Sequence, residues 1–198
     1  KNEPCKYDIE KFIELLQEAE RPLVLAGGGV HLSGAYDKLA YFVQKYQLPI
    51  ITSVDGKGSI SEYYEYALGT VGANGGSAEA NDFAKMADLI IVLGCKLDNV
   101  TTFGRQLISP EAKVVQVDIS ETVIENNQRV VLPIMTDINA FLTAVTTMDD
   151  SAVDYALKHK LWLEQAKAKK NEKWDRIAKE SQREGKEVVV ARLIMALD

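Results

Sequence analysis

Short apolar runs alternate with amphipathic segments along residues 8–147, and this alternation limits the possible folds more than any other feature. The clearest run is Asp88–Leu93, DLIIVL, which is apolar on both faces of an extended chain, as buried parallel strands are. Six runs are predicted to be strands: 23–26, 49–52, 66–70, 88–93, 113–117 and 130–135. Strands that alternate with helices indicate an α/β fold, in which helices cover both faces of a parallel sheet.

The segments between these runs carry apolar residues at helical spacing, as Ile9, Phe12, Ile13 and Leu16 do. Helices are predicted at 8–20, 33–46, 77–86 and 137–147. Pro133 has no backbone N–H to donate, so the sixth run is expected to be an edge strand or an irregular one.

The composition changes near residue 148, where a lysine-rich stretch without proline begins. It predicts one or two exposed helices with Val153, Leu157 and Leu161 as a narrow apolar stripe, and a further helix at 187–197. We interpret residues 1–150 as one domain, and residues 151–198 as a charged helical linker together with the truncated start of the next domain. The linker is expected to lie outside the core.

Charge and composition exclude several classes of protein. The formal net charge is -6, whereas a nucleic-acid-binding protein would present a basic face. No apolar run approaches the roughly 18 residues that cross a bilayer, so no membrane partner is expected. Cys5 and Cys95 lie far apart and do not form a metal-binding spacing, which fits a reducing, cytoplasmic location. Because the chain starts at Lys1 and stops at Asp198, we expect a fragment of a longer protein.

A glycine turn follows the first predicted strand. Gly27-Gly28-Gly29 leads from that strand into a helix, an arrangement that lets backbone N–H groups approach a phosphate. Gly27 and Gly29 fit the dinucleotide pattern G-x-G-x-x-G, but Leu32 stands where the third glycine belongs. A tight turn that binds no ligand therefore remains an equal alternative.

Polar residues follow the other strands, where ligands of open α/β sheets bind. They are Thr52, Gly94, Lys96, Asp118 and Asp137. The backbone and Lys96 could hold a phosphate, and Asp118 could accept hydrogen bonds from ribose hydroxyls. Alternatively, Asp118 and Asp137 are helix N-caps.

No set of residues predicts catalysis or a metal site. Ser53, Ser59 and Cys95 have no histidine at a recognisable spacing, so no pair of nucleophile and base is evident. His31 follows the glycines and could reach a phosphate, but a solvated loop histidine is the simpler interpretation. His159 lies in the charged stretch without an evident partner.

Six landmarks in order resemble the central domain of acetolactate synthase and related thiamine-diphosphate enzymes. They are Arg21–Val30, Leu48–Thr52 with Gly56–Gly58, Leu68-Gly69 with Gly72, Ala87–Gly94, Val115–Ile119 and Pro133–Asp137. The resemblance covers about residues 5–147. It implies a Rossmann-like six-stranded parallel sheet of the type that sirtuins and electron-transfer flavoproteins share.

The resemblance also implies a function for a longer parent protein. Such parents are homo-oligomers with three domains, and they use thiamine diphosphate and Mg²⁺ to cleave or join bonds next to a 2-keto acid carbonyl. Their N- and C-terminal domains hold that cofactor, so a central domain alone is expected to be inactive. Val54-Asp55-Gly56 with Asn81 imitates the metal-binding G-D-G…N motif but lacks its first glycine. The alternative function is a nucleotide-binding regulatory module of a different enzyme.

In some relatives the central domain binds FAD or an ADP-containing ligand. The residues that would line this pocket by position are Gly28, Gly29, Thr52, Gly72, Gly94, Asp118 and Asp137. The chain departs from acetolactate synthases at 96–100, KLDNV, where they typically carry R-F-D-D-R. It also has Ala73-Asn74-Gly75 where M-H-G is usual. Both arginines are missing, and Lys96 cannot reproduce their two-pronged hydrogen bonding.

Overall fold

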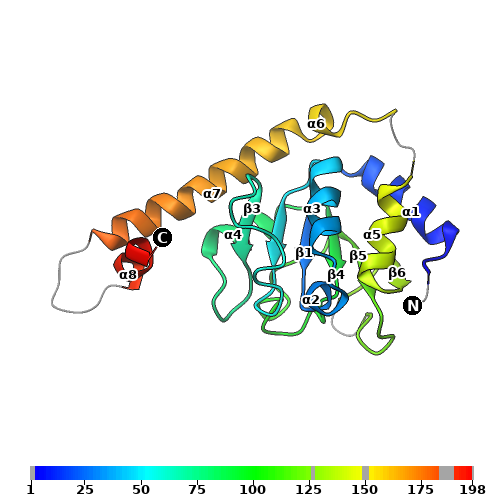
Figure 1. The fold of residues 1–198 in the computed structure, drawn as a ribbon, viewed down its shortest axis with the longest axis horizontal. Helices are drawn as coiled ribbons and strands as arrows, with labels where there is room; N and C mark the ends of the chain where they lie inside the picture. The colour runs from blue at the N-terminus through cyan, green and yellow to red at the C-terminus, as the bar shows by residue number, and fades with distance from the viewer. Residues whose placement is uncertain (1–2, 126–127, 149–151, 183–189, 198) are drawn as a thin grey trace.

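The computed structural model describes residues 3–125, 128–148, 152–182 and 190–197, and it contains a six-stranded parallel sheet (Figure 1). The strand order is β3-β2-β1-β4-β5-β6. The strands are β1 Pro22–Ala26, β2 Ile50–Thr52, β3 Ala67–Thr70, β4 Leu89–Leu93, β5 Lys113–Asp118 and β6 Leu132–Met135. All neighbouring strands pair in parallel, so the predicted α/β fold with six parallel strands is confirmed.

Helices cover both faces of this sheet, as predicted. They are α1 Lys6–Glu18, α2 Gly29–Ser33, α3 Tyr36–Lys45, α4 Ala78–Ala84, α5 Ile138–Thr146, α6 Tyr155–Lys158, α7 Lys160–Ser181 and α8 Val190–Leu197. None of the helices in these ranges combines the length and the apolar composition needed to cross a membrane.

Alternate residues of each central strand pack into two separate cores. In β1, Val24 and Ala26 belong to the core under α1, α3 and α5, whereas Leu23 and Leu25 belong to the core under α4 and α7. This division follows from the two-residue period of an extended chain. Because both faces are covered, every residue of β1 and β4 is buried, as the apolar run in β4 predicts.

Two predicted elements differ in detail. The helix expected at 33–46 is found as α3, which starts at Tyr36. The short helix α2 was not predicted, and Gly34 separates it from α3 with a left-handed φ of 61°. The sixth strand is an edge strand, as Pro133 predicts. Its alternate residues are exposed, and Pro133 is one of them.

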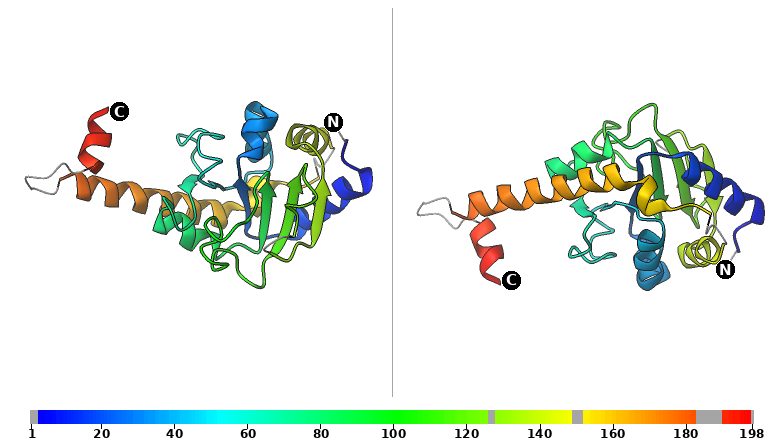
Figure 2. Two further views of the ribbon diagram at one scale, coloured as in Figure 1. Left: turned by 90° about the horizontal axis from the view of Figure 1, so that it is seen from below. Right: turned by 90° about the horizontal axis from the view of Figure 1, so that it is seen from above.

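The prediction that the linker lies outside the core is wrong for the first half of α7. Trp162 is 2% exposed and stacks on Phe83 of α4 with the ring centroids 3.9 Å apart. Ala166 is fully buried in the same core. Figure 2 shows α7 lying along the sheet beside α4 and then extending beyond it. The division of the chain near residue 150 stays a prediction.

The predicted apolar stripe is wrong for Leu157 and Leu161, which are 71% and 72% exposed, whereas Val153 packs against the core. The side chains that face the domain are His159, Trp162, Leu163 and Ala166, at the i, i+3, i+4 and i+7 positions of one helical face. The expected helix at 187–197 is found as α8 from Val190 onwards, and residues 187–189 lie outside the described residues.

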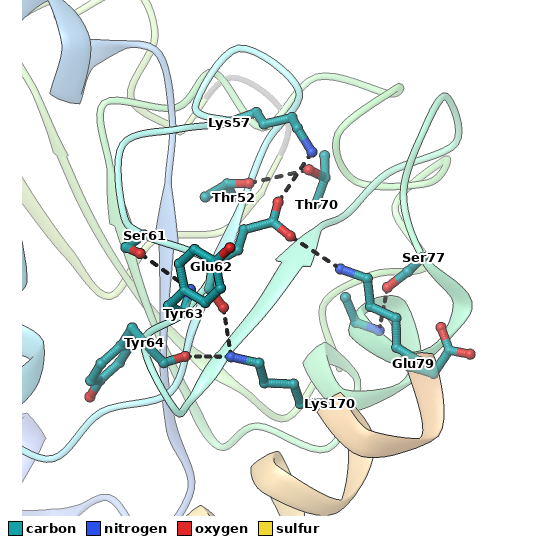
Figure 3. Close-up of polar contacts among 12 residues, drawn as sticks. Thr52, Lys57, Ser61, Glu62, Tyr63, Tyr64, Thr70, Ser77, Glu79 and Lys170 are labelled. Atoms are coloured by element: carbon teal, nitrogen blue, oxygen red, sulfur yellow. Dashed lines mark hydrogen bonds and ion pairs between the residues drawn. The ribbon is translucent and has the colours of Figure 1, made fainter. Parts of the chain in front are cut away.

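Lysines of α7 hold the loop between β2 and β3 against the helix (Figure 3). The Lys170 ammonium donates to the carbonyl oxygens of Glu62 and Tyr64 at 2.7 and 2.6 Å. The Glu62 carboxylate lies 3.1 Å from Lys57 and 3.6 Å from Lys173. Burial alone would raise the pKa of Glu62, but Lys173 and Lys57 together lower it. The linker helix is thus fixed to the domain by polar contacts and by its buried aromatic ring.

His159 sits fully buried at the junction of α6 and α7. Its Nδ1 lies 3.2 and 3.3 Å from the carbonyl oxygens of Tyr46 and Gln47, so Nδ1 carries a proton and donates it. In the neutral ring Nε2 then has only a lone pair, and it is buried without a hydrogen-bond partner among the described residues. Burial lowers the pKa of His159 below its ordinary value of about 6.5.

We expect the protein to lose stability as the pH falls below about 6.5, because the unfolded state then binds a proton that the buried ring resists. Above that pH both states are neutral and this loss is absent. The measurement is urea unfolding of the protein and of His159→Asn at about pH 7.5 and about pH 5.5. The variant should lose less stability between the two pH values. His31→Asn is the control. An equal loss of unfolding free energy between the two pH values in His159→Asn and His31→Asn would contradict the prediction.

Candidate functional site

A cavity of about 770 Å³ lies at the carboxyl edge of the sheet. Its lining comes from the segments that follow β1, β2, β4, β5 and β6. The strand order reverses between β1 and β4, and a crevice at such a switch point is the usual ligand site of an open α/β sheet. The volume is within the range of small-molecule sites, about 300–1,000 Å³.

The structure brings six of the eight predicted site residues together in this lining. They are Gly28, Gly29, Gly94, Lys96, Asp118 and Asp137. Thr52 and Gly72 are not among the lining residues. The Thr52 side chain is buried and lies 3.4 Å from the hydroxyl of Thr70. The Gly72 amide donates to the Asn81 side chain at 2.9 Å, so this second turn is stabilised from α4.

The glycine turn uses most of its amides internally. Gly27 N–H donates to Leu93 O at 2.8 Å, Gly29 N–H to Gly94 O at 2.9 Å, and Val30 N–H to Gly27 O at 3.2 Å. A Cβ placed on Gly29 would lie 2.6 Å from the Cα of Gly94, so the two glycines allow two backbone segments to touch. These glycines therefore join β1 to β4, as in the alternative of a tight turn, and leave few donors for a phosphate.

Three carboxylates of the lining are held by backbone amides. One oxygen of Asp118 accepts from Ser120 N–H at 2.9 Å, and one oxygen of Asp98 accepts from Thr101 N–H at 2.7 Å. Asp137 is the N-cap of α5, where it accepts from Ala140 N–H at 3.2 Å. For Asp137 the N-cap interpretation is therefore correct, whereas Asp118 precedes no helix in the described residues. Each of these bonds engages one carboxylate oxygen, so the other oxygen of each aspartate can accept a hydrogen bond from a ligand.

Asp55 and Asp98 are not among the eight predicted site residues, although both line the cavity. Asp98 follows Lys96 by two residues in the same strand-end loop. Asp55 is brought there by Gly56, whose hypothetical Cβ would lie 2.1 Å from Ala26 O. The loop after β2 therefore packs directly on the end of β1. Their position in the loops just beyond β2 and β4 is the sequence feature that could have indicated both residues.

Neither His31 nor Cys95 of the lining is set up as a general base or a nucleophile. His31 Nε2 lies 3.1 Å from Lys57 O, and Nδ1 lies 3.0 Å from the Tyr36 hydroxyl, so both ring nitrogens have protein partners. Burial raises the pKa of the Cys95 thiol, which keeps it protonated and weakly nucleophilic. Within the described ranges, no group of three His, Cys, Asp or Glu side chains is placed to hold a metal ion.

Comparison with known proteins identifies the fold family. Residues 9–145 match the family of the thiamine pyrophosphate enzyme central domain, thiamine pyrophosphate being another name for thiamine diphosphate. The chain belongs to this family. The prediction of a thiamine-diphosphate enzyme central domain is thereby confirmed, and the cavity is a feature of that central domain.

The central domain is similar to parts of several enzymes. It is 36% identical over 146 residues to a probable acetolactate synthase large subunit of Methanococcus aeolicus, covering 74% of this chain and 24% of the relative. It is 31% identical over 157 residues to the acetolactate synthase large subunit of Lactococcus lactis, covering 78% and 27%. A 3D-(3,5/4)-trihydroxycyclohexane-1,2-dione hydrolase of Geobacillus thermodenitrificans is 34% identical over 121 residues, covering 61% and 19%. The chain thus spans about a quarter of the length of such relatives.

Proposed function

We propose that this chain is the non-catalytic central domain of a thiamine-diphosphate- and Mg²⁺-dependent lyase or synthase of the acetolactate synthase type, acting on 2-keto acids. The observation that carries the proposal is the similarity of residues 9–145 to the family, with acetolactate synthase large subunits among the relatives. Because the match covers about a quarter of each relative, N- and C-terminal domains of the parent and a second copy of it are the proposed partners.

The residues of this chain do not fit a Mg²⁺–diphosphate site. Asp55 lines the cavity, but the Asn81 side chain lies on α4 and accepts the Gly72 amide at 2.9 Å. The imitation of the G-D-G…N motif therefore has no shared site in the described structure. Thiamine diphosphate and Mg²⁺ are proposed to bind to other domains of the parent, and no step of the reaction is assigned to this chain.

The cavity is proposed to hold an adenosine-containing ligand, such as FAD or ADP. Its place at the switch point and its volume support this proposal. The free oxygens of Asp118 and Asp137 would accept hydrogen bonds from the ribose hydroxyls, and the Lys96 ammonium would face the phosphates. The cytoplasm is the proposed location, which agrees with the free cysteines Cys5 and Cys95.

Calorimetry and an activity assay on the purified chain test this function. Pyruvate, thiamine diphosphate and Mg²⁺ should give no turnover and no binding heat, whereas an adenine nucleotide should bind. Turnover of pyruvate by this chain would overturn the non-catalytic assignment. Binding of thiamine diphosphate with Mg²⁺ would overturn the assignment of that cofactor to other domains.

A further inference from the structure

The charged groups of the cavity are mostly acidic. Asp55, Asp98, Asp118 and Asp137 line it, and the cation among its described lining residues, apart from the histidine, is Lys96. Asp118 and Asp137 are half-buried, so solvent screens them less than the exposed Asp55 and Asp98. The lining therefore carries four carboxylates and one ammonium, a charge balance that is unfavourable for a diphosphate.

Several groups that could offset such a charge are already engaged. The amides of Gly27, Gly29 and Val30 donate to the protein's own carbonyl oxygens. Both nitrogens of His31 also have protein partners. Helix α2 has only five residues, so it adds little favourable dipole. Among the described lining residues, apart from the histidine, Lys96 is therefore the cationic side chain that could face an anion.

The same cavity suits an uncharged ligand. Carboxylate oxygens accept hydrogen bonds from hydroxyl groups, and such bonds to a charged acceptor are stronger than neutral ones. Leu32 and Ile119 also line the cavity, although they are 93% and 66% exposed. These two side chains offer an apolar surface for a flat ring. Such a ligand would explain why two large aliphatic side chains are exposed beside the aspartates of the cavity.

We propose that the cavity selects an uncharged nucleoside, with its sugar hydroxyls on Asp118 and Asp137 and its base on Leu32 and Ile119, and that each phosphate weakens binding. This inference deepens the proposed function, because it rests on the adenosine-containing ligand and states which part of it provides the affinity. FAD and ADP then bind through their adenosine portion, against repulsion of the diphosphate by Asp55 and Asp98.

Calorimetry of the whole chain with adenosine, AMP and ADP tests this order. At low salt we expect Kd to rise about threefold or more with each phosphate, because the charges repel. At about 0.5 M salt the difference between adenosine and ADP should shrink, since screening weakens repulsion but leaves hydroxyl contacts intact. Asp98→Asn should lower the ratio of the ADP Kd to the adenosine Kd by about threefold.

Two further variants separate contact from charge. Asp118→Asn should weaken adenosine by about tenfold, because an amide is a poorer acceptor than a carboxylate. Asp37→Asn changes the net charge equally, but Asp37 is exposed on α3 and does not line this cavity, so all three Kd values should be unchanged.

The possible failures are distinct. ADP binding at low salt as tightly as adenosine, or more tightly, would overturn the inference and leave the nucleotide cavity of the proposed function intact. An equal effect of Asp37→Asn and Asp98→Asn on the Kd ratio would also overturn it, since long-range charge would then suffice. If adenosine, AMP and ADP all fail to bind, both the nucleotide ligand of the proposed function and this inference are overturned. The domain's family membership would stand.

Discussion

Trp162→Ala is expected to lower the free energy of unfolding by about 3–5 kcal/mol, which is typical for removing a buried aromatic ring. Trp162 is 2% exposed and stacks on Phe83 with an interplanar angle of 18°. Its indole N–H also donates to the carbonyl oxygen of Pro22 at 2.8 Å, at the first residue of β1. The substitution therefore leaves both a cavity and an unsatisfied carbonyl under α7.

Urea unfolding followed by circular dichroism measures this effect. Trp174→Ala is the matched control, because Trp174 lies on the same helix but is 37% exposed, and its loss should be below about 1 kcal/mol. Trp162→Phe keeps an aromatic ring and removes the N–H, so it should cost about 1–3 kcal/mol. Similar losses for the two alanine variants would show that α7 is not part of the stable domain.

Gly94→Ala is expected to cost more than about 3 kcal/mol, because it combines backbone strain with a collision inside the core. Gly94 has a φ of 60°, and a Cβ there would lie 2.5 Å from the Cα of Gly29. The added Cβ meets the backbone of Gly29 just beyond the end of β1, so no flexible side chain can move to relieve this contact. The cavity should also change shape, because both glycines line it.

Two variants separate the contributions to this loss. Gly34→Ala has nearly the same φ, 61°, but nothing lies within 4 Å of its Cβ, so it should cost about 1–2 kcal/mol. Gly29→Ala introduces the same contact, 2.6 Å from the Cα of Gly94, without a positive φ. Equal losses for Gly94→Ala and Gly34→Ala in urea unfolding would show that conformation alone sets the cost and that the strand ends can separate.

The cavity shows how far position along the chain predicts a site. Asp118 and Asp137 could be placed there because the carboxyl ends of parallel strands meet at one edge. Gly72 could not be excluded from sequence, because the backbone of Val100 that packs against it comes from a distant segment of the chain and its amide is bound by Asn81 of α4. The position of Asp55 in the lining depends on Gly56 packing against the end of β1, which only the folded chain shows.

The sequence by itself determined the parallel sheet, the two-sided cover of helices and the residues of its edge. Strand alternation, the all-apolar run of β4 and Pro133 act locally, so each can be recognised without knowledge of its neighbours. The family resemblance extended this local information to the order of the landmarks.

Only the tertiary structure decided which face of the linker is buried and which amides remain for a ligand. The apolar pattern favoured Leu157 and Leu161, yet the domain accepts His159 and Trp162, because distant carbonyl oxygens of Tyr46 and Pro22 satisfy their N–H groups. The amide of Gly29 likewise meets Gly94 only after β1 and β4 pair. Hydrogen bonds between remote segments exist only in the folded chain, so no local pattern of residues can specify them.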